Sequence, residues 1–269
     1  MASFLRHYLL AVQFFTRIPV TGRLAEWVGF SPAMLRASAA HFPGVGWLAA
    51  LLAAGVYAAL HQALAPNALA PVVAAAFCTI ATVLMTGGFH EDGLADVADG
   101  LGGSADRERA LDIMKDSRIG AFGALALVLA LLAKVSLLGA LGAHSLAAAA
   151  AALAGAHVVS RFWPLLIVRS LPHVGDTARS KSKPLADQIT GRALAAAAFW
   201  CFLPLALVWQ ALPAMFLVAS VLTSAGVAAW MGRWFARRLQ GFTGDCLGAT
   251  QQVSEIGFYL GAALALRWL

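Results

Sequence analysis

The chain has very little charge. Of its 269 residues, 12% are charged and 61% are hydrophobic, and the mean hydropathy is +0.77. A typical soluble domain is about a quarter charged, so these residues cannot cover a water-exposed surface. Cysteine and proline are also scarce, with three and ten residues, which excludes a disulfide scaffold and a collagen-like chain. The high apolar content excludes a disordered chain.

Long apolar runs make up most of what is present. A membrane-spanning helix needs roughly 20 mainly apolar residues. The sequence therefore predicts an all-α fold, a polytopic integral membrane bundle that forms a single domain over residues 1–269. About seven spans are predicted, at 44–62, 68–86, 119–141, 146–170, 193–210, 213–231 and 248–268. The shorter segment 4–15 carries polar residues within its apolar stretch and predicts an N-terminal amphipathic helix at the membrane interface.

Basic residues mark one side of this arrangement. The N-terminal segment and the connections 87–118, 171–192 and 232–247 hold most of the Lys and Arg, whereas the connections on the other side hold none. The positive-inside rule then predicts a cytoplasmic N-terminus and three cytoplasmic loops. It also accounts for the net charge of +6 without a nucleic-acid partner. Lys134 is expected near the outer end of its span, with its amine snorkelling to the interface.

The acidic residues gather between positions 91 and 116. Asp92, Asp96 and Asp99 are spaced i, i+4, i+7, which places them on one stripe of a helix. Like charges on one stripe repel each other, so the pattern favours a cation among them. A ligand set made only of oxygens favours Mg²⁺ or Mn²⁺ over zinc. The alternative interpretation is a solvated acidic helix face.

Two groups of cations lie in the same predicted cytoplasmic regions. Lys115 and Arg118 precede the third span, and Arg179, Lys181 and Lys183 lie in the next loop. Magnesium held by carboxylates commonly binds substrate phosphates, and cations nearby would neutralise the phosphate oxygens. The alternative role for both groups is topological anchoring.

A second polar group precedes and enters the seventh span. Asp245 lies just before that span, and Gln251 and Glu255 lie within it at i, i+4 spacing. A carboxylate inside a membrane is costly and is by default a functional-site hypothesis. The alternative is a structural partner for Arg161 or Arg169 in the fourth span.

Four segments resemble the cobalamin synthase family, the adenosylcobinamide-GDP ribazoletransferases. They are QFFTRIP at 13–19, GFHEDGLADVADG at 88–100, MKDSRIG at 114–120 and GDCLGA at 244–249. The resemblance implies a multi-pass enzyme of the bacterial inner membrane with its active-site loops in the cytoplasm. It also implies the substrates, adenosylcobinamide-GDP and α-ribazole or α-ribazole 5′-phosphate, with Mg²⁺ as cofactor and GMP released. The oligomeric state stays open, including a homo-oligomer.

The resemblance and the charge pattern together give the candidate residues. The candidate metal ligands are Glu91, Asp92, Asp96, Asp99 and Asp245. The candidate catalytic residues are Asp92, His90, Lys115, Asp116 and Arg118. The candidate substrate- and phosphate-binding residues are Lys115, Arg118, Arg179, Lys181, Lys183 and Gln251.

A different class of protein is compatible with some of these residues. In a membrane transporter or cation channel, Glu255, Arg161 and the acidic helix would form an ion pathway. Against this alternative, the acids cluster in one connection instead of lining several spans.

Overall fold

The computed structural model describes residues 2–175 and 189–268. This part of the chain is helical and has no β-strand, apart from an isolated bridge between His173 and Phe242. The α-helices are α1 Ala2–Phe15, α2 Gly22–Val28, α3 Pro32–Ser38, α4 Phe42–Ala63, α5 Ala70–Thr86, α6 Phe89–Gly103, α7 Arg107–Met114, α8 Ala121–His144, α9 Leu146–Ser170, α11 Gly191–Ala211, α12 Ala214–Arg238 and α13 Gly244–Ala265. Two short 3₁₀ helices, Ala39–His41 and Leu266–Trp268, adjoin α4 and α13.

Every predicted span coincides with a long helix, namely α4, α5, α8, α9, α11, α12 and α13. Among the described residues, five helices are long and apolar enough to cross a membrane, or six if the bent pair α5 and α6 forms one span. The protein is therefore a multi-pass membrane protein with an all-α fold. The count of seven stays a prediction, because α5 alone has 17 residues and α13 carries Asp245 and Glu255.

Proline and glycine residues set two of the boundaries. Pro213 separates α11 from α12, at the boundary between the predicted spans 193–210 and 213–231. Gly87 and Gly88 separate α5 from α6, and both have positive φ, +68° and +71°. Two successive left-handed residues turn the chain sharply at low cost only when both are glycine. The axes of α5 and α6 are consequently bent by 91°.

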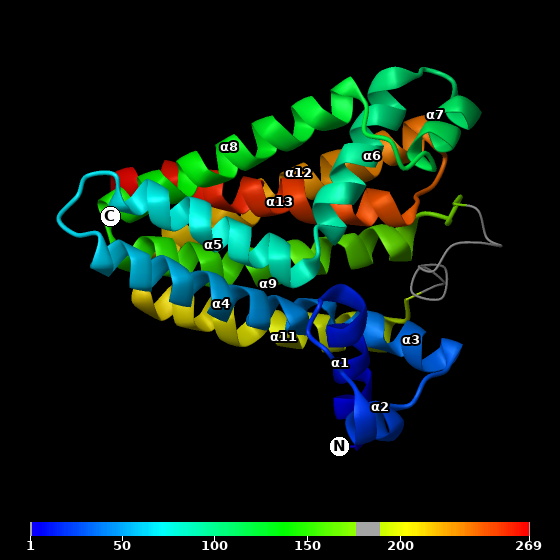
Figure 1. The fold of residues 1–269 in the computed structure, drawn as a ribbon, viewed down its shortest axis with the longest axis horizontal. Coiled ribbons are helices and arrows are strands. Elements are labelled where there is room, and N and C mark those ends of the chain that lie inside the picture. The colour runs from blue at the N-terminus through cyan, green and yellow to red at the C-terminus, as the bar shows by residue number, and fades with distance from the viewer. Residues whose placement is uncertain (1, 176–188, 269) are drawn as a thin grey trace.

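The long helices run side by side, and α1 and α6 lie across one end of the bundle (Figure 1). We call this the α6 end. The connection 87–118, predicted as a loop, is largely helical and forms α6 and α7. The spacing of Asp92, Asp96 and Asp99 predicts a helix within this connection, and α6 confirms it. The buried side chains of α6 include Leu94, Val97 and Leu101.

Buried apolar residues hold the crosswise helices in place. Leu10, Val12 and Phe15 of α1 belong to the same apolar cluster as Leu94 and Val97 of α6. The predicted amphipathic helix is thus confirmed as a helix, and its buried face packs against the bundle. A second cluster lies among the long helices, where Ala148, Ala149 and Ala152 of α9 are completely buried. Small side chains of this kind allow close helix packing in lipid.

Candidate active site

A pocket of about 600 Å³ opens at the α6 end. Its lining comes from three parts of the chain that are distant in sequence. They are the end of α1 with the residues that follow it, the bend and first turns of α6, and the segment before α8 together with Leu127 of α8. Its polar lining residues are Gln13, Thr16, Arg17, Thr86, Asp92, Asp96 and Ser117. Three of the four sequence segments that carry the family resemblance therefore surround one cavity.

The fourth segment, at 244–249, packs against α6 on the side away from the segments that line the pocket. A Cβ added at Gly93 of α6 would lie 2.8 Å from the carbonyl oxygen of Asp245, in the first turn of α13. Only a residue without a side chain allows α6 and α13 to approach this closely. Asp245 is thereby held beside α6, where Thr243 donates a hydrogen bond of 3.2 Å to its Oδ2.

The carboxylates of α6 have different environments. Asp92 and Asp96 both line the pocket. Burial, followed by the charges of Asp245, Asp92 and Asp99, raises the pKa of Asp96 to about 7. Crowded carboxylates of this kind disfavour their own ionisation, and a bound cation would relieve that repulsion. The helical stripe predicted from the sequence is confirmed, and its first two members face the pocket.

Asp99 has a structural contact that the sequence did not predict. Its Oδ2 accepts a hydrogen bond of 2.7 Å from the amide of Gly120, and its Oδ1 accepts one of 2.8 Å from the amide of Gly123. Both amides lie at the start of α8, where backbone N–H groups have no partner within the helix. Asp99 therefore caps α8 and fixes this helix to α6.

Glu91 turns away from the pocket toward α13. Its Oε1 accepts a hydrogen bond of 3.0 Å from Gln252 Nε2, and its Oε2 is buried without a hydrogen-bond partner among the described residues. His90 is also buried, 1% exposed, and its ring stacks on Phe42. Burial lowers the pKa of His90 well below its usual value. Both residues thus belong to the interior of the α6 end.

Lys115, Asp116 and Arg118 pair locally at the surface. Lys115 Nζ lies 3.7 Å from Asp112 Oδ1, and Arg118 Nε donates a hydrogen bond of 3.0 Å to Asp116 Oδ1. The hydrogen bonds from Arg118 lower the pKa of Asp116 to about 2. From the segment 115–119, it is Ser117 and Ile119 that line the pocket. Arg179, Lys181 and Lys183 lie outside the described residues.

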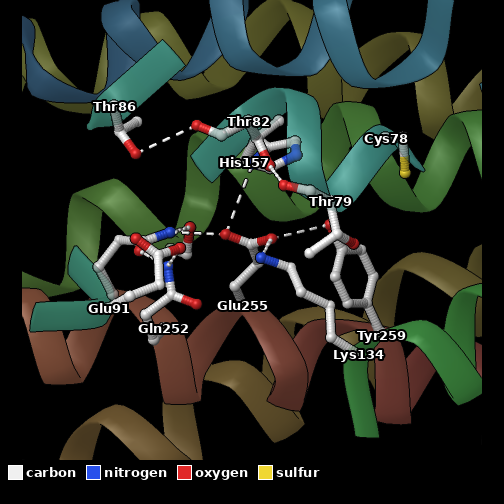
Figure 2. Close-up of polar contacts among 12 residues, drawn as sticks. Cys78, Thr79, Thr82, Thr86, Glu91, Lys134, His157, Gln252, Glu255 and Tyr259 are labelled. Carbon is white, nitrogen blue, oxygen red and sulfur yellow. Dashed lines mark hydrogen bonds and ion pairs between the residues drawn. The ribbon is translucent and has the colours of Figure 1, made fainter. Parts of the chain in front are cut away.

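Glu255 is the centre of a polar cluster in the core of the bundle (Figure 2). Gln251 is hydrogen-bonded to Glu255 and belongs to this cluster. Gln251 Nε2 donates to Glu255 Oε2 at 2.6 Å and to Ser160 Oγ at 3.0 Å. Lys134 Nζ lies 2.7 Å from Glu255 Oε1, which also accepts a hydrogen bond from Tyr259. His157 Nδ1 lies 3.5 Å from Glu255 Oε2.

Two expectations about these core residues were wrong. Lys134 does not snorkel: its side chain is 3% exposed and forms an ion pair in the bundle interior. Among the described residues, the ion contacts of Glu255 are with Lys134 and His157, and not with Arg161 or Arg169. Arg161 instead donates a hydrogen bond of 2.7 Å to the carbonyl of His157 in its own helix.

The carboxylates do not form a complete metal cage by themselves. Within residues 2–175 and 189–268, no group of three His, Cys, Asp or Glu side chains is arranged to hold an ion. Magnesium seldom uses such a cage, since it keeps several waters and is usually bound by one or two carboxylates together with substrate phosphates. Asp92 and Asp96, on one wall of an open pocket, match that mode of binding.

A family model described as cobalamin-5-phosphate synthase matches residues 7–263. The chain belongs to this family. It is 62% identical to a protein of Albidiferax ferrireducens over 99% of this chain and 100% of the relative. It is 61% identical to one of Polaromonas sp. over 99% of each chain, and 39% identical to one of Vibrio cholerae over 97% of this chain and 95% of the relative. Each relative is named adenosylcobinamide-GDP ribazoletransferase. No solved structure matches the chain.

Membership of the cobalamin synthase family settles the class of protein. The chain is a transferase of cobalamin biosynthesis, and the transporter or channel alternative is not supported. Arg17 lines the pocket, although it is not among the candidate residues predicted from the sequence. The sequence does contain an indication of such a role, because Arg17 lies within the segment 13–19 that carries the family resemblance.

Proposed function

We propose that this chain joins adenosylcobinamide-GDP to α-ribazole, or to α-ribazole 5′-phosphate, and releases GMP in the pocket at the α6 end. One observation carries the proposal. The family-specific segments at 13–19, 88–100 and 114–120 meet around a single cavity, and the segment at 244–249 packs against the helix that provides its carboxylates. The substrates are those in the name of the relatives.

We propose Mg²⁺ as the cofactor, held by Asp92 and Asp96, with Asp245 as the nearest further carboxylate. Support comes from the oxygen-only donor set and from the raised pKa of Asp96, which is caused first by burial and then by the charges of Asp245, Asp92 and Asp99. When bound, the ion would neutralise charge on the phosphate oxygens as GMP leaves. We leave Asp99 out of this ligand set, because both of its oxygens accept hydrogen bonds from backbone amides of α8 and its side chain does not line the pocket.

In the proposed reaction, the ribazole hydroxyl oxygen forms a bond to the phosphorus on the corrinoid side of the pyrophosphate. The bond from that phosphorus to the bridging oxygen breaks, and GMP carries the bridging oxygen away. We assign the acceptor of the hydroxyl proton to a pocket carboxylate, Asp92 or Asp96, in preference to His90. The ring of His90 is buried against Phe42 and does not line the pocket.

We propose that the α6 end faces the cytoplasm of a bacterial inner membrane. The basic residues support this orientation, since Arg17 and Arg118 lie at this end and the last turn of α12 contains Arg237 and Arg238. A cytoplasmic pocket would also be accessible to a substrate activated with GDP.

The experiment is GMP release by the purified protein in nanodiscs, with adenosylcobinamide-GDP and α-ribazole supplied. Wild type should release GMP with Mg²⁺ and not with EDTA. Asp92→Asn should abolish release while keeping the thermal stability of the metal-free protein. Asp106→Asn is the matched control, because Asp106 caps α7 outside the pocket and asparagine preserves the cap. Wild-type turnover by Asp92→Asn, or turnover in EDTA, would refute the metal assignment.

A further inference from the structure

Arg17 occupies the wall of the pocket formed by the segment after α1. Its backbone amide donates a hydrogen bond of 2.7 Å to the carbonyl of Met85, at the end of α5. Its side chain lies against Gly87, so closely that a Cβ added at Gly87 would overlap the guanidinium group. The bend between α5 and α6 therefore holds both the main chain and the side chain of Arg17.

Within the described residues, the charge of Arg17 has no acidic partner. In the described part of the chain, no carboxylate is within ion-pair distance of its guanidinium group, although Asp92 and Asp96 line the same pocket. By contrast, Lys115 and Arg118 have acidic partners beside them in sequence. An unpaired cation and two carboxylates that line one cavity are suited to a ligand carrying both anionic oxygens and a metal ion.

We propose that Arg17 binds the phosphate oxygens of the nucleotide-activated substrate. The inference rests on the proposed function and assigns to Arg17 the role that sequence reasoning gave to Lys115 and Arg118. A guanidinium group presents a planar fork of N–H donors that matches two phosphate oxygens at once. Gly87 then has a second role besides forming the bend between α5 and α6. Any side chain at this position would displace the guanidinium group of Arg17.

The test uses Arg17→Ala, Arg17→Lys and Gly87→Ala in nanodiscs, with Arg23→Ala as the matched control. Arg23 is an exposed arginine of α2 that does not line the pocket. One measurement is steady-state kinetics. Arg17→Ala should raise the KM for adenosylcobinamide-GDP about tenfold or more and leave the KM for α-ribazole within about twofold. The KM of Arg17→Lys for adenosylcobinamide-GDP should lie between those of Arg17→Ala and wild type. A lysine ammonium keeps the positive charge but lacks the planar pair of N–H donors.

The second measurement is binding without turnover, with GDP and Mg²⁺ as the probe in calorimetry. Arg17→Ala should weaken GDP binding about tenfold, and Gly87→Ala should weaken it in the same direction although Arg17 is still present. Arg23→Ala should bind GDP as wild type does. If Arg17→Ala matches Arg23→Ala in both measurements, the role of Arg17 is refuted.

The two proposals fail in distinguishable ways. Wild-type protein that releases no GMP would refute the proposed function, and GDP binding that still depends on Arg17 would then support a phosphate site of another activity. Mg²⁺-dependent GMP release by wild type with normal kinetics and GDP binding in Arg17→Ala would preserve the function and refute only the role of Arg17.

Discussion

Lys134 of α8 and Glu255 of α13 form an ion pair of 2.7 Å in the interior of the bundle, where their side chains are 3% and 1% exposed. Both side chains are buried, and each charge lies beside the opposite charge of its partner. Removing one partner of such a pair leaves an uncompensated buried charge.

The first prediction concerns this pair. Lys134→Met should destabilise the protein by about 3–5 kcal/mol, because Glu255 would remain buried with His157, Gln251 and Tyr259 as its only partners among the described residues. The measurement is thermal unfolding in detergent. The double variant Lys134→Met with Glu255→Gln should recover much of the loss. Equal stability of Lys134→Met and wild type would show that the pair contributes nothing.

The second prediction separates Asp99 from Asp92. Asp99→Ala should destabilise the protein by about 1–3 kcal/mol, because the amides of Gly120 and Gly123 lose their acceptor. Any remaining activity should need the same Mg²⁺ concentration as wild type. Unfolding curves and a Mg²⁺ titration of GMP release are the two measurements. A large increase in the Mg²⁺ requirement at unchanged stability would identify Asp99 as a ligand instead of a cap.

The third prediction concerns the approach of α6 to α13. Gly93→Ala places a Cβ 2.8 Å from the carbonyl oxygen of Asp245, which is main chain and has little freedom to move. It should lower both thermal stability and GMP release. Gly103→Ala is the control, because its Cβ would lie 3.6 Å from the Ile113 side chain, an ordinary contact. Alanine favours the helix more than glycine does, so helix propensity alone predicts a gain in both variants. Equal losses in the two variants would show that the close approach at Gly93 is not the cause.

The fourth prediction concerns pH in the metal-free protein. The pKa of Asp96 is raised to about 7, so between pH of about 4 and 7 the folded protein retains a proton that the unfolded chain has lost. Folding stability in EDTA should therefore decrease as the pH rises from about 4 to about 7. Melting temperatures across this range provide the measurement. In Asp96→Asn, the melting temperature should depend less on pH over this range. An equally steep dependence in that variant would show that another group causes the loss of stability.

The helices could be predicted from sequence because each apolar run specifies its own local structure. The bend at Gly87 and Gly88 was harder to predict, because a Gly-Gly pair is compatible with many turns and its angle depends on packing. The spacing of the aspartates correctly indicated a helix in the acidic connection, but it did not identify Leu94, Val97 and Leu101 as the residues that bury this helix.

The site could be predicted only in part. Spacing correctly places Asp92 and Asp96 on one helical face, and the structure adds a pocket against that face. Spacing cannot show what lies opposite, so it did not distinguish Asp99, whose neighbour is the start of α8, from the other two carboxylates. The position of Arg17 depends on α1 folding across the bundle end, and the partner of Lys134 depends on how α8 and α13 are rotated. Both are tertiary facts that local patterns do not contain.

The Lys134–Glu255 pair also has a consequence for how the protein is made. During synthesis α8 precedes α13, so Lys134 enters the bilayer before its counter-ion exists. A lysine at the centre of a span costs about 2.5–3.5 kcal/mol during insertion. α8 has a mean hydropathy of 2.4, the highest of the five apolar spans, and its other side chains offset that cost. When α13 inserts, Glu255 neutralises the charge of Lys134, which is already in the membrane. The docking of α13 is therefore a late step of assembly to which this ion pair contributes.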